Sequence, residues 1–152
     1  MKKSLSSYFL FFLVLLQAIS AIPAGLSLIF DPSGKSIGLP IEMLEPSPFR
    51  NFFIPGVFLF VVLGIFPIIT FYGLLRKNKS KLAEKINLYK EYHWSWTFSY
   101  YLGLLLILWI NMQLFFIRDF GMLHFIYSML GVLIILITHL PNTKRDYKLY
   151  SY

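Results

Sequence analysis

Cysteine is absent from the sequence, which excludes disulfide bonds, thiolate metal sites and thiol redox chemistry. Charge is scarce as well: charged residues make up 14% of the chain, against about 25% in soluble domains, and only seven residues are acidic. Glycine-rich phosphate loops and Ser-His-Asp signatures are also missing. These absences remove the common motifs for nucleotide binding and covalent catalysis.

The chain has an excess of apolar residues instead. Hydrophobic residues make up 57% of its 152 residues, against about 45–50% in soluble domains. One domain of this length, covering residues 1–152, has too little interior to hide that much apolar surface from water. The sequence therefore predicts a single integral membrane domain whose exterior is mostly solvated by lipid.

Four long apolar runs predict an all-α fold, a four-transmembrane-helix bundle. The first run would reach about 35 Å as a helix and so cross a hydrocarbon core of about 30 Å. Lys2 and Lys3 before it also resemble the start of a signal peptide, but a signal core is only about 7–15 residues long, so we expect a retained helix. The predicted helices cover about 8–30, 53–75, 94–117 and 121–140.

Small and polar residues within these runs mark faces that we expect to contact other helices. In the second run Pro67 removes a backbone hydrogen bond, so we expect a bend near residues 63–67, with a hydroxyl such as that of Thr70 satisfying freed groups. In the third run Ser99 and Gly103 lie four residues apart. In the first run the small and polar stripe consists of Gln17, Ser20, Ala21, Ala24 and Ser27.

Most of the turn chemistry lies in residues 31–56, between the first two runs. Asp31-Pro32-Ser33-Gly34 has the residues that a type I turn favours, because Asp can bond its own backbone and Pro presets φ. Further prolines restrict the unfolded chain in this segment. We therefore expect an ordered loop with a short helical segment around residues 42–44 or starting at Ser47.

Basic residues are distributed unevenly around the predicted helices. Eleven Lys and Arg residues fall in the two ends of the chain and in residues 76–92, whereas Lys35, Arg50 and Arg118 fall on the other side. The positive-inside rule places both termini in the cytoplasm and residues 31–56 outside an inner membrane. Residues 76–92 are expected to form a solvated loop or, in part, an amphipathic helix on anionic headgroups. The net charge of +7 lies between apolar runs and not along one face, which argues against nucleic acid as a partner.

Ionisable residues at the predicted outer rim are the candidates for ligand binding, because such groups are expensive to bury in or near a bundle. The alternative is structural, since residues at helix ends reach headgroups or water and pair with one another. No catalytic residue is assigned and no cofactor is expected; the three histidines fall on opposite surfaces and cannot form one metal site. The seven candidates are Asp31, Glu42, Glu45, Arg50, Arg118, Asp119 and His124.

Arg50 and His124 carry the most specific expectations. If Ser47 caps a helical turn, Arg50 falls near the positive end of that turn and needs a carboxylate partner among the four outer acids. His124 shares a small and polar helical face with Ser128 and Gly131, which predicts that it points into the bundle.

Several segments of the first half resemble a group of uncharacterised small four-helix bacterial membrane proteins. In that group the outer loop is typically similar to DPSG, then GLP, then GSPF, a charged pair and F-IPG. This chain departs from the pattern at Glu45-Pro46, where a glycine is expected before the serine. The resemblance implies the fold but no activity and no catalytic residues, and a more distant similarity to the DoxX-like class is one of architecture alone. The matching segments are residues 21–25, 31–34, 39–40 and 47–56.

Three functions agree with these features. The leading hypothesis is a non-enzymatic inner-membrane protein, either an accessory subunit that contacts another membrane protein or a second copy, or a binder of a lipid-like molecule beneath the outer loop. The alternative is a small enzyme acting on a membrane lipid or isoprenoid, with His124 as acid or base and Arg50 or Arg118 holding an anionic headgroup. A proton or solute carrier ranks last, because few polar residues lie near mid-membrane.

Overall fold

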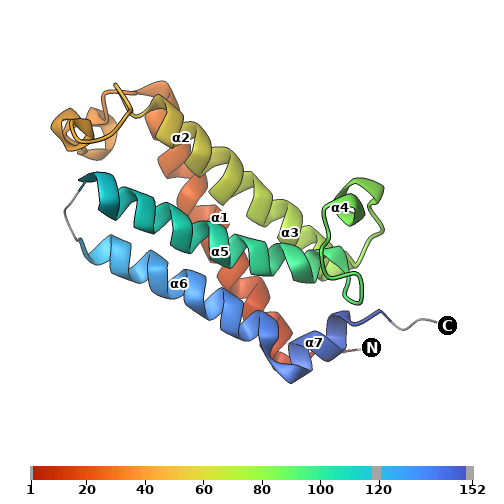
Figure 1. Cartoon of the computed structure of the whole chain (residues 1–152). Coiled ribbons are helices and arrows are strands. Elements are labelled where there is room, and N and C mark those ends of the chain that lie inside the picture. The colour runs from red at the N-terminus through yellow and green to blue at the C-terminus, as the bar shows by residue number, and fades with distance from the viewer. Residues whose placement is uncertain (1, 118–120, 150–152) are drawn as a thin grey trace.

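The computed structural model describes residues 2–117 and 121–149, and it confirms the predicted all-α class within those ranges. No strand occurs in the described residues; an isolated bridge joins Tyr92 to Lys148. Between α1 and α2 lie two short 3-10 helices, and α2 continues into α3 through a π-helical segment, η3 (Figure 1). The elements are α1 Leu5–Phe30, η1 Lys35–Ile37, η2 Ile41–Leu44, α2 Phe53–Phe60, η3 Val61–Ile65, α3 Phe66–Arg76, α4 Lys81–Lys85, α5 Trp94–Ile117, α6 Met122–His139 and α7 Pro141–Tyr147.

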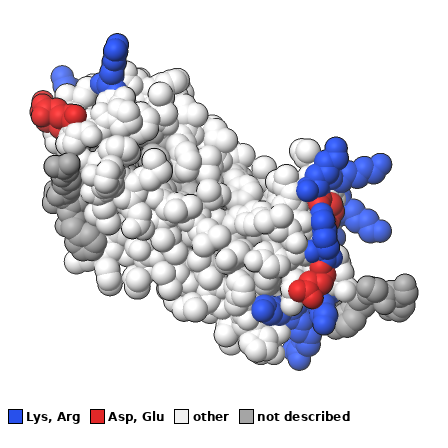
Figure 2. All heavy atoms as spheres, viewed as in Figure 1, with Lys and Arg blue, Asp and Glu red and all other residues white. Residues whose placement is uncertain are grey.

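Four of these helical stretches are long and apolar enough to cross a membrane: Leu5–Phe30, Phe53–Arg76, Trp94–Ile117 and Met122–His139. They agree with the four predicted runs, although the first begins three residues earlier than predicted. Charged side chains gather at the two ends of the molecule, and the surface between them is uncharged on the face shown in Figure 2. We call the end that carries residues 31–52 the loop end, and the end that carries α4, α7 and the start of α1 the terminal end (Figure 1).

Two close helix crossings depend on glycine. A Cβ added to Gly25 of α1 would lie 2.6 Å from the backbone nitrogen of Phe60 and 2.9 Å from the carbonyl oxygen of Gly56, both in α2. A Cβ on Gly103 of α5 would lie 2.8 Å from the carbonyl oxygen of Gly131 in α6. Small residues thus let these helix pairs approach, which is how helices associate where lipid removes the hydrophobic drive.

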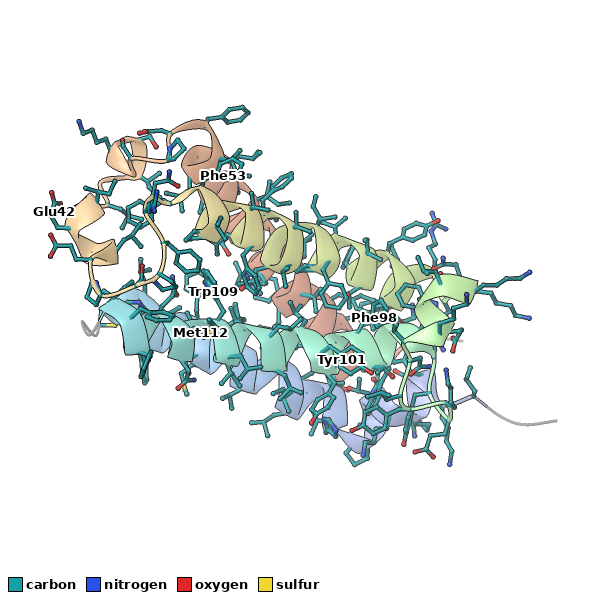
Figure 3. The ribbon with its side chains drawn as sticks, turned by 45° about the horizontal axis from the view of Figure 1, so that its top comes forward. Glu42, Phe53, Phe98, Tyr101, Trp109 and Met112 are labelled. Atoms are coloured by element: carbon teal, nitrogen blue, oxygen red, sulfur yellow. The ribbon has the colours of Figure 1, made fainter. Side chains whose placement is uncertain are left out.

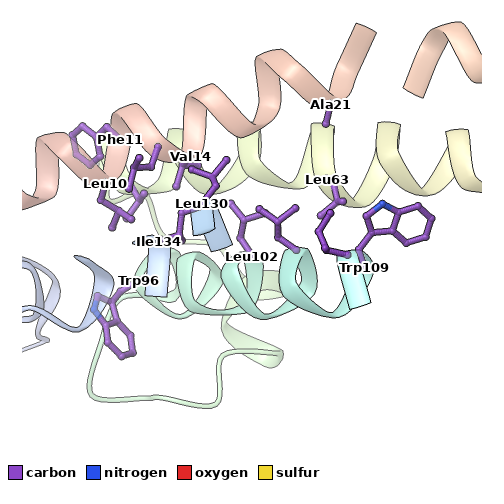
Figure 4. Packing of buried hydrophobic residues seen from close by; sticks show 14 of the residues in the cluster. Leu10, Phe11, Val14, Ala21, Leu63, Trp96, Leu102, Trp109, Leu130 and Ile134 are labelled. Atoms are coloured by element: carbon purple, nitrogen blue, oxygen red, sulfur yellow. The ribbon is translucent and has the colours of Figure 1, made fainter. Parts of the chain in front are cut away.

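Large apolar side chains fill the space between the helices. The main cluster joins Leu10 and Val14 of α1 to Leu102 and Leu106 of α5 and to Ile134 of α6, each at most 1% exposed. Figure 4 shows this packing, with Ala21, Leu63 and Trp109 toward one side of it. The side chains on the outside are also apolar, which suits a lipid solvent and would be costly in water.

The helix containing Pro67 is not interrupted, because it widens to π geometry at Val61–Ile65, where the N–H of Phe66 donates to the carbonyl of Val61. Proline has no N–H, so residue 67 donates no backbone bond in this helix. The Thr70 hydroxyl does not supply the missing bond, because it donates to the Phe66 carbonyl at 2.9 Å. The Leu63 carbonyl accepts a bond from a different helix, at Gln17.

Polar contacts hold the terminal end together across long sequence separations. The Lys3 ammonium donates to the carbonyls of Leu74 and Leu75 at the end of α3, at 2.7 and 2.6 Å. The Tyr147 hydroxyl of α7 donates to the same Leu74 carbonyl at 2.8 Å. A cation at this position also suits the negative end of the helix dipole. The two ends of the chain are therefore both anchored to the end of α3.

Asp146 of α7 caps the start of α1. One of its carboxylate oxygens accepts from the Ser4 backbone N–H at 2.7 Å, the Ser4 hydroxyl at 2.6 Å and the Ser7 hydroxyl at 2.8 Å. Burial raises the pKa of Asp146, but the bonds from Ser4 and Ser7 act in the opposite direction and the net pKa lies below the usual value. A negative charge is favourable here because it faces the positive end of α1.

Candidate functional site

A cavity of about 440 Å³ lies at the loop end, between residues 37–52 and the helices α1, α2, α5 and α6. We call it the loop cavity. Its walls are mostly apolar, and none of the described residues that line it is Lys, Arg, Asp or Glu. It is lined by Gln17, Ser20, Ala21, Ala24, Leu28, Ile37, Leu39, Met43, Leu44, Ser47, Phe49, Phe52, Pro55, Leu59, Leu63, Leu106, Trp109, Ile110, Met112, Gln113, Phe116, Ile117, Leu123, His124 and Tyr127.

Residues 31–52 form a wall of this cavity because they have a small core of their own. Leu44 and Phe52 pack on Leu28 of α1, and all three are buried. The segment is held by backbone bonds, among them one from the Phe52 N–H to the carbonyl of Pro32 at 2.9 Å. Figure 3 shows Trp109 pointing from α5 toward α2, whereas Glu42 points away from the helices.

Pairs of aromatic rings hold the side chains of α5 that line the opposite wall of the loop cavity. Trp109 stacks on Phe58 of α2 with ring centroids 4.3 Å apart, and Phe116 of α5 meets Phe49 of the loop edge to face at 6.5 Å. Such pairs add about 0.5–1.5 kcal/mol beyond the area that they bury. The cavity is therefore bounded by fixed rings on the α5 side.

Gln17 is the most deeply buried polar residue of the loop cavity, at 1% exposed. Its Nε2 donates to the Leu63 carbonyl at 3.2 Å, and its Oε1 has no hydrogen-bond partner among the described residues. The amide cannot be turned around, since two oxygens would then face each other. The sequence predicts Gln17 on a helix-contact face and does not assign it to a site; Pro67, which removes a backbone N–H from the second long helix, is the available signal.

His124 is the one predicted site residue, among those described, that lines the loop cavity. Its Nδ1 accepts a bond from the Gly121 backbone N–H at 3.1 Å, so the proton of the neutral ring lies on Nε2. The ring therefore also caps the start of α6. The prediction that His124 faces the other helices agrees with this placement.

The predicted acids of the loop lie outside the cavity. Asp31 accepts from the Ser33 hydroxyl at 2.6 Å, from the Ser33 N–H at 3.2 Å and from the Ser36 N–H at 2.8 Å, and the bond from the Ser33 hydroxyl contributes most to lowering its pKa. Asp31 thus bonds its own turn, as its type I turn sequence predicts. Glu42 and Glu45 are exposed.

Arg50 is exposed and does not line the cavity either. No helix starts at Ser47: the short helical segment is Ile41–Leu44, in agreement with one of the two predicted positions, and α2 starts only at Phe53. The premise that Arg50 lies in the first turn of a helix is therefore wrong. Within the described ranges no ion pair joins it to a carboxylate.

The two remaining candidates, Arg118 and Asp119, lie outside the described residues. In the ranges 2–117 and 121–149 there is no group of three or more His, Cys, Asp or Glu residues that could hold a metal ion. The enzyme hypothesis needs His124 and a cation at one place, and the described residues bring His124 to the cavity without Arg50.

A second, open cavity of about 820 Å³ lies at the terminal end and is strongly basic. Two of its lysines are used internally, because Lys77 donates to the Asp146 carbonyl and Lys90 to the Glu84 carbonyl. α4 is only five residues long and Leu82 is exposed, so the amphipathic helix considered for residues 76–92 is short. The cavity is lined by Lys77, Lys79, Ser80, Lys81, Glu84, Lys85, Lys90, His93, Tyr147, Lys148 and Leu149.

His93 at the edge of this basic cavity is a structural residue. Its Nδ1 accepts from the Ser95 N–H at 3.3 Å and its Nε2 donates to the Asn78 carbonyl at 3.1 Å. Burial lowers the pKa of His93, which keeps the ring neutral in this tautomer.

Comparison with protein-family models, with curated proteins and with solved structures gives no match for the chain. The resemblance of residues 31–56 to small four-helix membrane proteins therefore stays a prediction.

Proposed function

We propose that this protein is a non-enzymatic inner-membrane protein that binds a lipid-like molecule in the loop cavity. The observation that carries the proposal is the cavity itself, with about 440 Å³ of space, fixed aromatic walls and a few polar groups. Small-molecule sites are commonly about 300–1,000 Å³ and are lined in this way. A lining without charged residues in the described part favours the apolar portion of an amphiphile over its charged headgroup.

The proposal includes a placement in the membrane. Eleven basic residues belong to the terminal end by sequence, so we infer that this end is cytoplasmic and that residues 31–52 form an ordered loop outside. The loop cavity then opens at the depth of the outer leaflet, and its ligand can enter from the lipid.

Single cysteines introduced into this cysteine-free chain test the placement. A cysteine replacing Lys35 should react with an impermeant thiol reagent added to intact cells, and one replacing Lys81 should react only after lysis, because both positions are exposed but lie at opposite ends. The reverse labelling pattern would mean that the molecule is inserted the other way round.

Filling the cavity tests the binding. Ala24 lines the cavity, whereas Ile19 of the same helix is 61% exposed on the outside. The amphiphile that co-purifies with the protein in mild detergent, measured by mass spectrometry after extraction, should decrease about fivefold or more in Ala24→Phe and stay unchanged in the control Ile19→Phe. Met43→Trp fills the same space from the loop and should act like Ala24→Phe. Equal retention in all three variants, each shown to be folded by its thermal unfolding, would contradict the proposal.

A further inference from the structure

The unpartnered oxygen of Gln17 restricts what the loop cavity binds. Gln17 stands near the middle of α1, about 18 Å along the helix from Leu5. At that depth of a bilayer little water is present to pair with a polar atom, so an unsatisfied buried acceptor is destabilising. The Oε1 of Gln17 has no donor among the described residues and is shielded from solvent.

Two serine hydroxyls that line the same cavity donate to other acceptors. Ser20 donates to the Gln17 backbone carbonyl at 3.0 Å, and Ser47 donates to the Leu44 carbonyl at 2.8 Å. The Gln17 amide is also held in place, because its Nε2 donates to the Leu63 carbonyl at 3.2 Å. Oε1 is therefore an unpaired acceptor on a residue that lines the cavity, as Leu63 and Ala21 also do.

We propose that the ligand of the loop cavity is an uncharged amphiphile whose hydroxyl donates a hydrogen bond to Gln17 Oε1. This inference rests on the proposed binding function and adds the chemical class of the ligand, a long-chain or isoprenoid alcohol. An anionic headgroup does not fit this acceptor, because an ionised carboxylate or phosphate oxygen has no hydrogen to donate and would place a second acceptor against it. A pure hydrocarbon would leave the acceptor unpaired.

A matched pair of probes tests the hydroxyl. The protein is reconstituted in phosphatidylcholine nanodiscs and titrated with 1-dodecanol or with its methyl ether, and the apparent affinity is taken from the rise of the unfolding midpoint with concentration. The alcohol donates a hydrogen bond and the ether does not. The alcohol should bind about tenfold more tightly than the ether.

The variant Gln17→Met removes the acceptor at similar volume and should abolish the preference for the alcohol. Because it also removes the Nε2 donor of the Leu63 carbonyl, the comparison is repeated with Pro67→Ala and the double variant, in which residue 67 regains a backbone N–H. The ratio of the two affinities within each variant cancels differences in membrane partitioning.

The outcomes separate the two proposals. A preference for the alcohol in the parent and in Pro67→Ala that disappears on adding Gln17→Met supports the inference. Equal binding of alcohol and ether to the parent overturns it, with water as the partner of Oε1, and leaves the proposed function standing. Stabilisation by neither probe contradicts the inference and the proposed function together.

Discussion

Charged side chains at the two ends of the molecule differ in how many hydrogen bonds they make to the rest of the protein. At the terminal end, Lys3, Asp146 and Tyr147 are bonded to segments that lie about 70 or more residues away in the chain, and Asn78 Oδ1 is the exception among the described residues. At the loop end, Arg50 and the two glutamates are exposed, and the cavity wall contains an unpaired amide oxygen. The terminal end is thus built for stability. The loop end keeps a mostly apolar cavity, as binding sites often do.

The largest effect on stability is expected for Asp146→Ala at the terminal end. The change removes the acceptor of three hydrogen bonds and leaves donors at the start of α1 unpaired, so the free energy of unfolding should decrease by about 2 kcal/mol. Chemical denaturation in detergent measures it. Glu45→Ala, an exposed acid at the loop end, is the control and should change stability by less than about 0.5 kcal/mol.

The same pair of proteins also gives a pH dependence. Since the pKa of Asp146 is lowered below 3.8 in the folded state, its contribution is present at neutral pH and is lost as the pH falls through the folded value. The difference between the parent and Asp146→Ala should therefore shrink in acid. A difference that is independent of pH would show that the lost contacts do not involve the carboxylate charge.

A smaller effect is expected at Lys77, which ends α3 with a φ of 51° and is the one non-glycine residue with positive φ in the described part of the chain. A side chain costs about 1 kcal/mol in this left-handed conformation. Lys77→Gly should be more stable than Lys77→Ala by about that amount, because both lose the ammonium and only glycine relieves the backbone. Equal unfolding midpoints of the two variants would contradict the assigned conformation.

The smallest effect is expected for Arg50→Ala at the loop end. Arg50 is exposed and its candidate partners in the described ranges are not within ion-pair distance, so stability should change by less than about 0.5 kcal/mol. A double-mutant cycle with Asp119→Asn examines the candidate partner outside those ranges. A coupling energy above about 1 kcal/mol would mean that the loop end is locked by an ion pair as well, and the contrast between the ends would weaken.

The site was less predictable from sequence than the fold. The helical face of His124 predicts a ring that points into the bundle, and His124 does line the loop cavity. Charge alone makes candidates of Asp31, Glu42, Glu45 and Arg50, and these four residues lie outside the cavity. A charged residue in an apolar sequence is a natural candidate for a site. At a helix end, however, its charge is solvated by water or, for Asp31, accepts hydrogen bonds from its own turn. The residues that build the cavity are ordinary apolar ones, and composition does not distinguish them from lipid-facing neighbours.

The sequence by itself determined the number and extent of the long helices, because hydrophobicity over some 20 residues is a local property of the chain. It also determined the turn at Asp31, which depends on neighbouring residues. Only the tertiary structure decided that Gln17 would donate to the Leu63 carbonyl, that Asp146 would cap a helix 142 residues earlier, and that a cavity would remain beneath residues 37–52. These features depend on contacts between segments that are distant in the sequence, and a pattern of neighbouring residues does not predict such contacts.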